Sequence, residues 1–334
     1  MSGTAWDGFG RRSAELPREP LDEATRAAED LPKTLQWVPG DDVVQRPVFD
    51  PSLKHHQNAY RATDPRFGDP ARGEEWRAAR RRALFLVLDA IAASQWVDAL
   101  VLRGSVLLSA WFPDTAREPG DLDFVVVPDT WRIDDGRTDR MLRGIAEAAQ
   151  TLAGTCGGEM DISARGAVVE DIWTYDRVPG RRMVLPWASP GLPGGHVQLD
   201  FVFNEHLPEA PEPTELPGGT VVQAATPGLS LAWKLMWLVN DMHGQGKDLY
   251  DAVLLAERHP LRYELLHEVF RLSGEWPCPQ RERILLEDVV QAVGYVEWNH
   301  FVTEYPQFGD AEREYADRLV RAVTKTFEGA ADSG

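Results

Sequence analysis

The sequence predicts an α+β protein whose C-terminal part is almost entirely helical. Short apolar and β-branched runs recur between residues 98 and 203, and Pro-Gly or Gly-Gly turns separate several of them, which is typical of strands. After Thr226, apolar residues instead recur at helical spacing. We therefore expect a mixed sheet with flanking helices, followed by a C-terminal helical bundle.

The individual elements follow from the same patterns. Helices are expected over 74–94 and 137–154, and a short helix after the turn that begins at Gly104. The predicted strands cover 98–103, 122–128, 167–176, 181–187 and 196–203. The later helices begin near Pro227, Lys247, Leu261, Gln280 and Asp310.

The chain is expected to form three consecutive parts. Residues 1–70 are polar and punctuated by proline, and we interpret them as an N-terminal extension. Its possible anchors to the body are Trp37, Val43, Val44, Val48 and Phe49. Residues 71–205 form the α+β core. Residues 206–334 form a C-terminal helical domain, which a loop or linker rich in Pro and Glu (205–220) precedes.

Composition limits the partners of this chain. The net charge of −18 repels phosphate backbones at long range, so a nucleic-acid partner would need a local basic patch or bound metal ions. The charge also argues against an anionic membrane, and no apolar run approaches the ~20 residues that span a bilayer. The first residues contain no apolar signal region, and the two cysteines lack metal-ligand spacing. We expect a cytoplasmic protein without membrane association.

Gly104 and Ser105 stand where a strand is expected to turn into a helix. Glycine allows the backbone to approach a phosphate, the serine hydroxyl can bind a phosphate oxygen, and the N-terminus of the following helix favours an anion. Taken alone, a Gly-Ser pair is more often an ordinary turn.

Asp121 and Asp123 open a strongly apolar strand. Residues two apart in a strand share one face and lie ~7 Å apart, so their carboxylates can flank a pair of divalent ions ~3.5–4 Å apart. Carboxylates beside a buried strand are costly unless a cation lies there, although a solvated strand start is the alternative. The pair predicts binding of Mg²⁺ or Mn²⁺, which prefer oxygen ligands.

The order of these features resembles the superfamily of DNA polymerase β-type nucleotidyltransferases. Its members share a strand, Gly-Ser, a helix, an arginine and then Asp-x-Asp at the start of another apolar strand. Arg117, four residues before Asp121, matches the arginine and could contact a phosphate or hold the loop; a surface arginine is the alternative. The resemblance implies that residues 71–205 form the nucleotidyltransferase catalytic core.

The resemblance also implies a third carboxylate on a neighbouring strand, which completes the metal site. Asp200 is the candidate, because it lies in mid-strand between Leu199 and Phe201, where an aspartate without a partner is unusual. Asp161 and Asp171 are the alternatives.

The helical part contains further charged residues at notable positions. Lys234 lies on an otherwise apolar helix, so its ammonium group must reach solvent or meet an anion, for which a nucleoside triphosphate is suitable. Lys247 precedes Asp248 and Asp251, which share a face of the next helix. Taken singly, a salt-bridged lysine and acids at a helix N-terminus explain these residues.

Together, the Gly-Ser turn, the Asp-Leu-Asp pair, the helical lysine and the Lys-Asp-Leu-Tyr-Asp segment resemble the AbiEii/AbiGii family of nucleotidyltransferase toxins. These are the toxin components of bacterial type IV toxin–antitoxin and abortive-infection systems. The resemblance covers about residues 50–260. Arg103 stands where the family often has a glycine, which could change how the triphosphate is held.

The family resemblance implies a role for each matching residue. Asp121 and Asp123 hold metal, Lys234 contacts the nucleotide, Asp248 is required for activity, and Asp251 is the second acid of its motif, with an open role. The nucleotide-binding set is completed by Gly104, Ser105, Arg117 and Lys247.

The resemblance also implies the reaction, in which a nucleoside monophosphate moves from a nucleoside triphosphate to an acceptor hydroxyl. The family favours a tRNA 3′ end as acceptor and an antitoxin protein as partner. A protein or small-molecule acceptor and a non-catalytic nucleotide-binding module are the alternatives. Basic residues that could contact acceptor phosphates, or simply form solvated faces, are Arg72, Arg77, Arg80, Arg81, Arg82, Arg177, Arg181 and Arg182.

Overall fold

The computed structural model describes residues 22–174 and 178–328, which divide into two compact units. The first unit holds the described residues as far as Trp96 together with Arg132–Val202, and the second holds Val97–Trp131 together with the described residues from Phe203 onward. Each unit is built from two separate stretches of chain, whereas the sequence predicts three consecutive parts. The glycine turn and the acidic pair belong to the same unit as the C-terminal helices.

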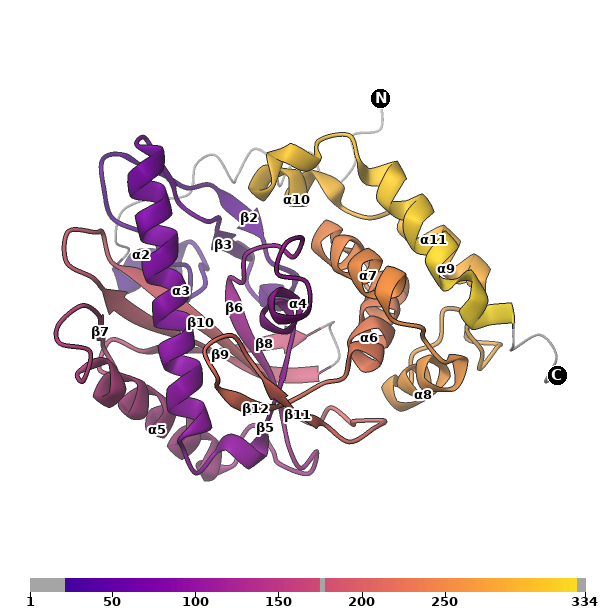
Figure 1. Ribbon diagram of the computed structural model, residues 1–334, viewed down its shortest axis with the longest axis horizontal. Helices are drawn as coiled ribbons and strands as arrows, with labels where there is room; N and C mark the ends of the chain where they lie inside the picture. Colours follow the sequence, from indigo (N-terminus) through magenta and orange to yellow (C-terminus); the bar gives the residue numbers. More distant parts are fainter. Residues whose placement is uncertain (1–21, 175–177, 329–334) are drawn as a thin grey trace. The chain divides into compact units, whose positions relative to one another are not determined.

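The first unit consists of antiparallel strands flanked by two long helices (Figure 1). Strand β9 (Val178–Ala188) pairs with β7 (Asp161–Ile162), β8 (Val168–Thr174) and β10 (Gly195–Val202). Helix α3 (Pro70–Ala92) packs against α5 (Gly136–Ala153) and β10. It does so because Ala79, Ala83 and Val87, which recur at helical spacing, are fully buried on one face.

Residues 22–69 belong to the first unit. They form α2 (Glu23–Ala28), the turn η2 (Pro51–Leu53) and two antiparallel pairs, β1 (Val43–Val44) with β4 (Arg66–Phe67) and β2 (Pro47–Phe49) with β3 (Tyr60–Ala62). Leu53 and Ala59 pack against Ile172 of β8, and Trp37 and Phe49 adjoin the buried clusters of this segment. Of the anchors expected from the sequence, Trp37 and Phe49 pack against buried residues and Val48 is buried, whereas Val44 is exposed.

The sheet of the second unit is mixed, as the sequence predicts. Its strands lie in the order β11 (Glu212–Glu215), β12 (Val221–Ala224), β5 (Leu100–Arg103) and β6 (Asp121–Val126). Strands β12 and β5 are parallel, and the other pairs are antiparallel. The expected loop over 205–220 thus contains β11. Pro213 is compatible with this position because an edge strand tolerates the missing amide proton.

Helices follow from Pro227 almost to the end of the described chain (Figure 1). They are α6 (Pro227–Asn240), α7 (Gly246–Arg258), α8 (Tyr263–Ser273), α9 (Leu286–Val293), α10 (Trp298–Glu304) and α11 (Glu312–Glu328). Helix α6 begins where Thr226 accepts a hydrogen bond from the N–H of Leu229 at 3.0 Å and Pro227 fills the first helical turn. It packs against α7, α8 and α9, which explains its apolar character on most faces.

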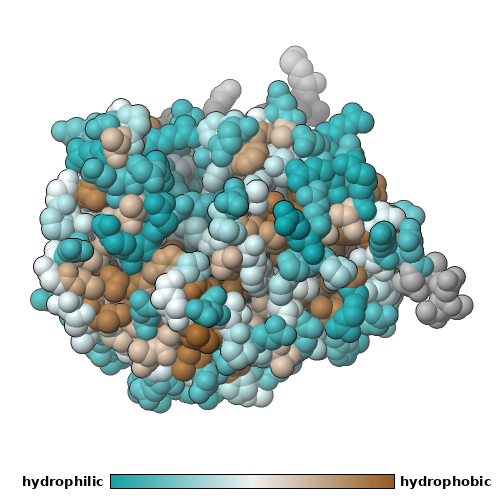
Figure 2. All heavy atoms as spheres, viewed as in Figure 1, coloured by the Kyte–Doolittle hydropathy of each residue, from teal (hydrophilic) through white to brown (hydrophobic). Residues whose placement is uncertain are grey.

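None of the helices in the described ranges combines the length and apolar character that a membrane crossing requires. On the face shown in Figure 2, hydrophilic residues predominate and apolar residues gather in scattered patches.

Candidate active site

The glycine turn and the acidic pair meet at the ends of two antiparallel strands. Gly104 follows β5 and precedes α4 (Ser105–Trp111), and its φ of +83° favours glycine. A Cβ at Gly104 would lie 2.3 Å from Oδ2 of Asp123, so the carboxylate rests on the glycine backbone. The hydroxyl of Ser105 donates to Oδ1 of Asp121 at 3.3 Å. The structure therefore brings the two sequence motifs into direct contact.

The two carboxylates lie on one face of β6. Leu122 and Phe124 point to the opposite face and are fully buried, while Asp121 and Asp123 are half-buried. Magnesium sites often use one or two carboxylates together with substrate phosphates and water. The oxygen-only donors of Asp121 and Asp123 fit such an ion. In residues 22–174 and 178–328, no group of three or more His, Cys, Asp or Glu side chains is arranged to hold a metal.

Four charged residues predicted separately form one buried ion cluster. The ammonium group of Lys234 on α6 lies 2.6 Å from Oδ1 of Asp248 and 3.1 Å from Oδ2 of Asp251, both on α7. Arg117 donates from Nε and Nη2 to the two oxygens of Asp251, each at 3.1 Å. The loop before β6 is thus bound to α7. Tyr250 strengthens this attachment, because its hydroxyl donates to the backbone carbonyl of Thr115.

The pKa values in this cluster reflect a competition between burial and charge. Burial opposes the charged form of Lys234, but the carboxylates of Asp248 and Asp251 outweigh it and raise the lysine pKa. Burial likewise opposes the guanidinium of Arg117, yet Asp251 raises its pKa well above the ordinary value. Burial raises the pKa of Asp251, but Arg117 and Lys234 have the larger combined effect and lower it. These three groups therefore stay charged at neutral pH.

Arg103 and Lys247 differ in whether their charge is already engaged by other side chains. The buried Arg103 faces away from solvent, with its guanidinium carbon 5.3 Å and 5.2 Å from the ring centres of Trp233 and Trp237 and one nitrogen 3.4 Å from Glu205. Lys247 is half-buried, and no carboxylate of the described residues lies within ion-pair distance of it. Among the cations of this unit's motifs, Lys247 has its charge available for a ligand.

Sequence reasoning did not identify Glu205, Trp233, Trp237 and Tyr250 as neighbours of the motifs. The two tryptophans are four residues apart, and their rings stack at 6.4 Å with 6° between the planes. That spacing on one helix was a usable signal, because residues four apart share a helical face. Glu205 has no comparable signal, because its partner Arg103 lies 102 positions away in the chain.

Asp200 belongs to the first unit, where an arginine engages both of its carboxylate oxygens. Arg182 donates to them from Nε and Nη2, each at 2.8 Å, and reaches Asp50 from Nη1 at 2.7 Å. All three side chains are buried. Of the alternatives, Asp161 is exposed and Asp171 forms an ion pair with Arg181. The predicted third carboxylate is therefore one arm of a buried Asp-Arg-Asp network.

Most of the predicted basic residues are engaged by acids. The ion pairs are Arg72 with Asp42, Arg77 and Arg81 with Glu74, Arg80 with Asp64, and Arg181 with Asp139 and Asp171. Arg177 lies outside the described residues. An acceptor phosphate would have to compete with these carboxylates.

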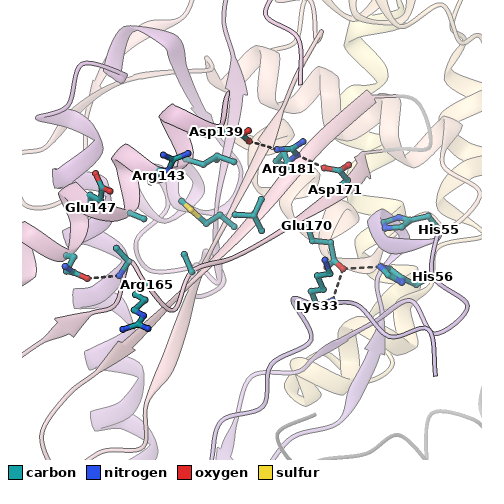
Figure 3. A pocket seen from close by; sticks show the side chains of 17 residues that line it. Lys33, His55, His56, Asp139, Arg143, Glu147, Arg165, Glu170, Asp171 and Arg181 are labelled. Atoms are coloured by element: carbon teal, nitrogen blue, oxygen red, sulfur yellow. Dashed lines mark hydrogen bonds and ion pairs between the residues drawn. The ribbon is translucent and has the colours of Figure 1, made fainter. Parts of the chain in front are cut away.

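A separate cleft of about 1070 Å³ lies within the first unit (Figure 3). Arg143, Glu147 and Arg165 line one side of it, and Lys33, His55 and His56 line the other. Its remaining acids are engaged internally: Arg181 bridges Asp139 and Asp171, and Glu170 accepts from the backbone of Lys33 and Thr34 and contacts His56. The cleft contains none of the motif residues, so we place the candidate active site at Gly104 and the acidic pair.

Comparison with known proteins agrees with the motifs. The family model described as "Nucleotidyl transferase AbiEii toxin, Type IV TA system" matches residues 86–331. The solved structures include one titled "Crystal structure of JHP933 from Helicobacter pylori", which is similar over 78% of this chain and 96% of its own, with 14% sequence identity and a TM-score of 0.46. None of the curated proteins compared with the chain matches it.

Proposed function

The chain belongs to the AbiEii family of nucleotidyl transferase toxins of type IV toxin–antitoxin systems, and from this premise we propose that it transfers a nucleoside monophosphate from a nucleoside triphosphate to the 3′ hydroxyl of a tRNA. One observation carries the proposal: the carboxylate of Asp123 rests on the backbone of Gly104 while Ser105 holds Asp121. The contact between the glycine turn and two acids able to bind metal supports the proposal of a polymerase β-type catalytic site.

Asp121 and Asp123 are the residues that would hold Mg²⁺ or Mn²⁺. When bound, the metal neutralises the triphosphate and increases the acidity of the acceptor hydroxyl. The side chain of Ser105 is buried and donates to Asp121, so we assign it the orientation of that carboxylate. Because Gly104 lacks a side chain, the carboxylate of Asp123 can lie against it, and we assign the backbone of this turn the approach to the β and γ phosphates.

The buried ion cluster of Arg117, Lys234, Asp248 and Asp251 holds the loop that leads to the acidic pair. Lys234 is committed to Asp248 and Asp251, so we assign it a positioning role: it holds Asp251, which holds Arg117 and the loop that leads into β6. Lys247 is half-buried with an available charge, so we propose that it meets the triphosphate.

The reaction forms one bond and breaks one. The acceptor oxygen bonds to the α-phosphorus, the bond between that phosphorus and the oxygen bridging to the β-phosphate breaks, and pyrophosphate leaves. The hydroxyl proton passes to a carboxylate of the acidic pair and then to water. Positioning and charge stabilisation supply most of the rate in such transfers. Asp200 remains the predicted third carboxylate only if it can release Arg182.

The test is to incubate the protein with each α-labelled nucleoside triphosphate, Mg²⁺ and total tRNA, beside the Asp123→Ala variant. We expect label on tRNA that is lost in the variant. Label on protein alone would show that the acceptor is a protein and not a tRNA. Saturable nucleotide binding without transfer to tRNA, protein or small molecules would show that the chain is a nucleotide-binding module and not an enzyme. Asp317→Ala, which alters an exposed carboxylate of α11, is the matched control and should transfer label normally.

A further inference from the structure

A second pocket, of about 590 Å³, lies between the end of α7 and the C-terminal half of α11. Cationic side chains dominate its lining, namely Arg258, Arg318, Arg321 and Lys325, with His259 beside them. The pocket lies in the unit that carries the acidic pair. Because an α-helix rises 1.5 Å per residue, Arg258 lies roughly 10 Å along α7 from Asp251 of the ion cluster.

The sequence of α11 builds this pocket directly. Arg318, Arg321 and Lys325 recur at spacings of three and four, so they share one helical face. Leu319 and Val323 lie on another face and are buried, which directs the cations outward. Ala322 lies among the cations and Ala256 lies on α7, and these small side chains leave the space open.

Charge in the pocket is unbalanced. Glu257 is the one carboxylate among its described lining residues, and Arg318 engages both of its oxygens at 2.8 Å. This hydrogen bonding lowers the pKa of Glu257. No carboxylate of the described residues lies within ion-pair distance of Arg258, Arg321 or Lys325. Three cations therefore face one pocket of a chain whose net charge is −18.

Helix electrostatics explain only part of this arrangement. Arg258 and Lys325 lie in the last turns of their helices, where cations are favoured. Arg321 lies two turns before the end of α11 and gains nothing comparable. The convergence of the three residues on one pocket also costs mutual repulsion, which a multiply charged anion would relieve.

We propose that this pocket binds adjacent phosphate groups, supplied by the backbone of the acceptor RNA. The identification of RNA rests on the proposed function. A guanidinium group can donate two hydrogen bonds to the oxygens of one phosphate. Neighbouring phosphates of a nucleic-acid backbone carry several negative charges close together, which can neutralise three adjacent cations. Free pyrophosphate has the same chemistry and is the other source of such groups. In a strongly acidic protein, a local basic pocket is what allows an RNA to dock despite long-range repulsion.

The test uses the full-length protein and a labelled single-stranded RNA whose 3′ end is blocked by a phosphate, so that binding is measured without transfer. We expect the Arg321→Ala/Lys325→Ala double variant to bind this RNA at least tenfold more weakly at low salt. If both cations contact phosphates, the slope of log affinity against log salt should fall by about 1.4, at ~0.7 per contact for single strands. Arg313→Ala, an exposed arginine of α11 outside the pocket, is the matched control and should leave affinity and slope unchanged.

Each further outcome decides the proposal. If pyrophosphate binds and the double variant abolishes its binding while RNA affinity is unchanged, the pocket is a phosphate site but RNA is not its ligand. Unchanged affinity of the double variant for both RNA and pyrophosphate overturns the proposal. The proposal is also overturned if polyglutamate displaces the labelled RNA more strongly than pyrophosphate does, because the pocket would then prefer carboxylates to phosphates. A loss of nucleoside triphosphate binding in the double variant would place the pocket in the nucleotide site instead. Failure of the proposed function is recognised separately, by the absence of label on tRNA when the unsubstituted protein is incubated with nucleoside triphosphates and Mg²⁺.

Discussion

Lys234 and Asp248 form a buried ion pair, with Nζ 2.6 Å from Oδ1, between two consecutive helices. Asp251 extends the pair to Arg117, so two cations and two anions neutralise one another in a largely buried cluster. Removing one partner of such a network leaves an uncompensated buried charge. The network is therefore the part of the candidate site where a single substitution has the clearest energetic consequence.

Lys234→Ala is expected to destabilise the protein by about 3–5 kcal/mol, because Asp248 loses its partner and Asp251 retains only Arg117. Urea unfolding measures the change. Lys247→Ala, which removes a lysine with no ion pair to the described residues, is the control and should change the free energy of unfolding by less than about 0.5 kcal/mol. Equal stabilities of the two variants would show that the cluster contributes nothing to folding.

Gly104→Ala is expected to abolish nucleotidyl transfer and Mn²⁺ binding together. The new Cβ would lie 2.3 Å from Oδ2 of Asp123, and φ is +83°, so the carboxylate must move. Electron paramagnetic resonance measures the bound Mn²⁺. Gly120→Ala is the matched control, because no described residue other than its two chain neighbours lies within 4 Å of a Cβ placed there. Normal Mn²⁺ binding in Gly104→Ala would remove Asp123 from the metal site.

Arg117→Lys is expected to lower kcat more than tenfold with little change in the KM for nucleotide. Lysine keeps the charge but cannot donate two parallel hydrogen bonds to Asp251, so the loop before Asp121 loses its alignment. Steady-state kinetics separates the two constants. An increase in KM at constant kcat would instead indicate that Arg117 binds the nucleotide directly.

Asp200→Asn tests whether that residue holds metal or supports the first unit. If its role is to neutralise Arg182, the variant should lose about 2–4 kcal/mol of stability, since a charged pair becomes a neutral hydrogen bond. Mn²⁺ binding would then persist in the folded fraction. A stable variant that no longer binds Mn²⁺ would establish Asp200 as the third carboxylate.

His196 makes stability depend on pH. Burial lowers its pKa to about 4 in the folded protein, against an ordinary value of 6.5. The unfolded chain therefore binds the proton more readily, so the stability contributed by neutral His196 is present above pH 6.5 and is lost as the pH falls toward 4. The difference between the two pKa values corresponds to about 3 kcal/mol. Thermal unfolding of His196→Gln should lose this dependence between pH 6.5 and 4; an identical pH profile would contradict the assignment.

The sequence predicted the strands and helices around the site closely, because hydrophobic periodicity and turn residues are local signals. The turn at Gly104, the strand that begins at Asp121 and the helix from Pro227 lie where they were expected. Strands β11 and β12 were not predicted, because a proline and several glutamates interrupt the apolar pattern of the first and the second has only four residues, and their pairing became visible only in the structure. The grouping of β5 and β6 with the C-terminal helices also has no local signal.

The sequence by itself determined which residues form the candidate site. A glycine before a helix and two aspartates on one strand face depend only on neighbours in the chain, so spacing was sufficient to identify them. Only the tertiary structure decided which charges are available. Arg117 and Asp251 are 134 positions apart, and Arg182 meets Asp50 across 132 positions. Ion pairing over such separations depends on how helices and strands pack. That packing pairs Lys234 with two carboxylates, whereas Lys247 and three cations of the basic pocket on α11 have no ion pair to the described residues.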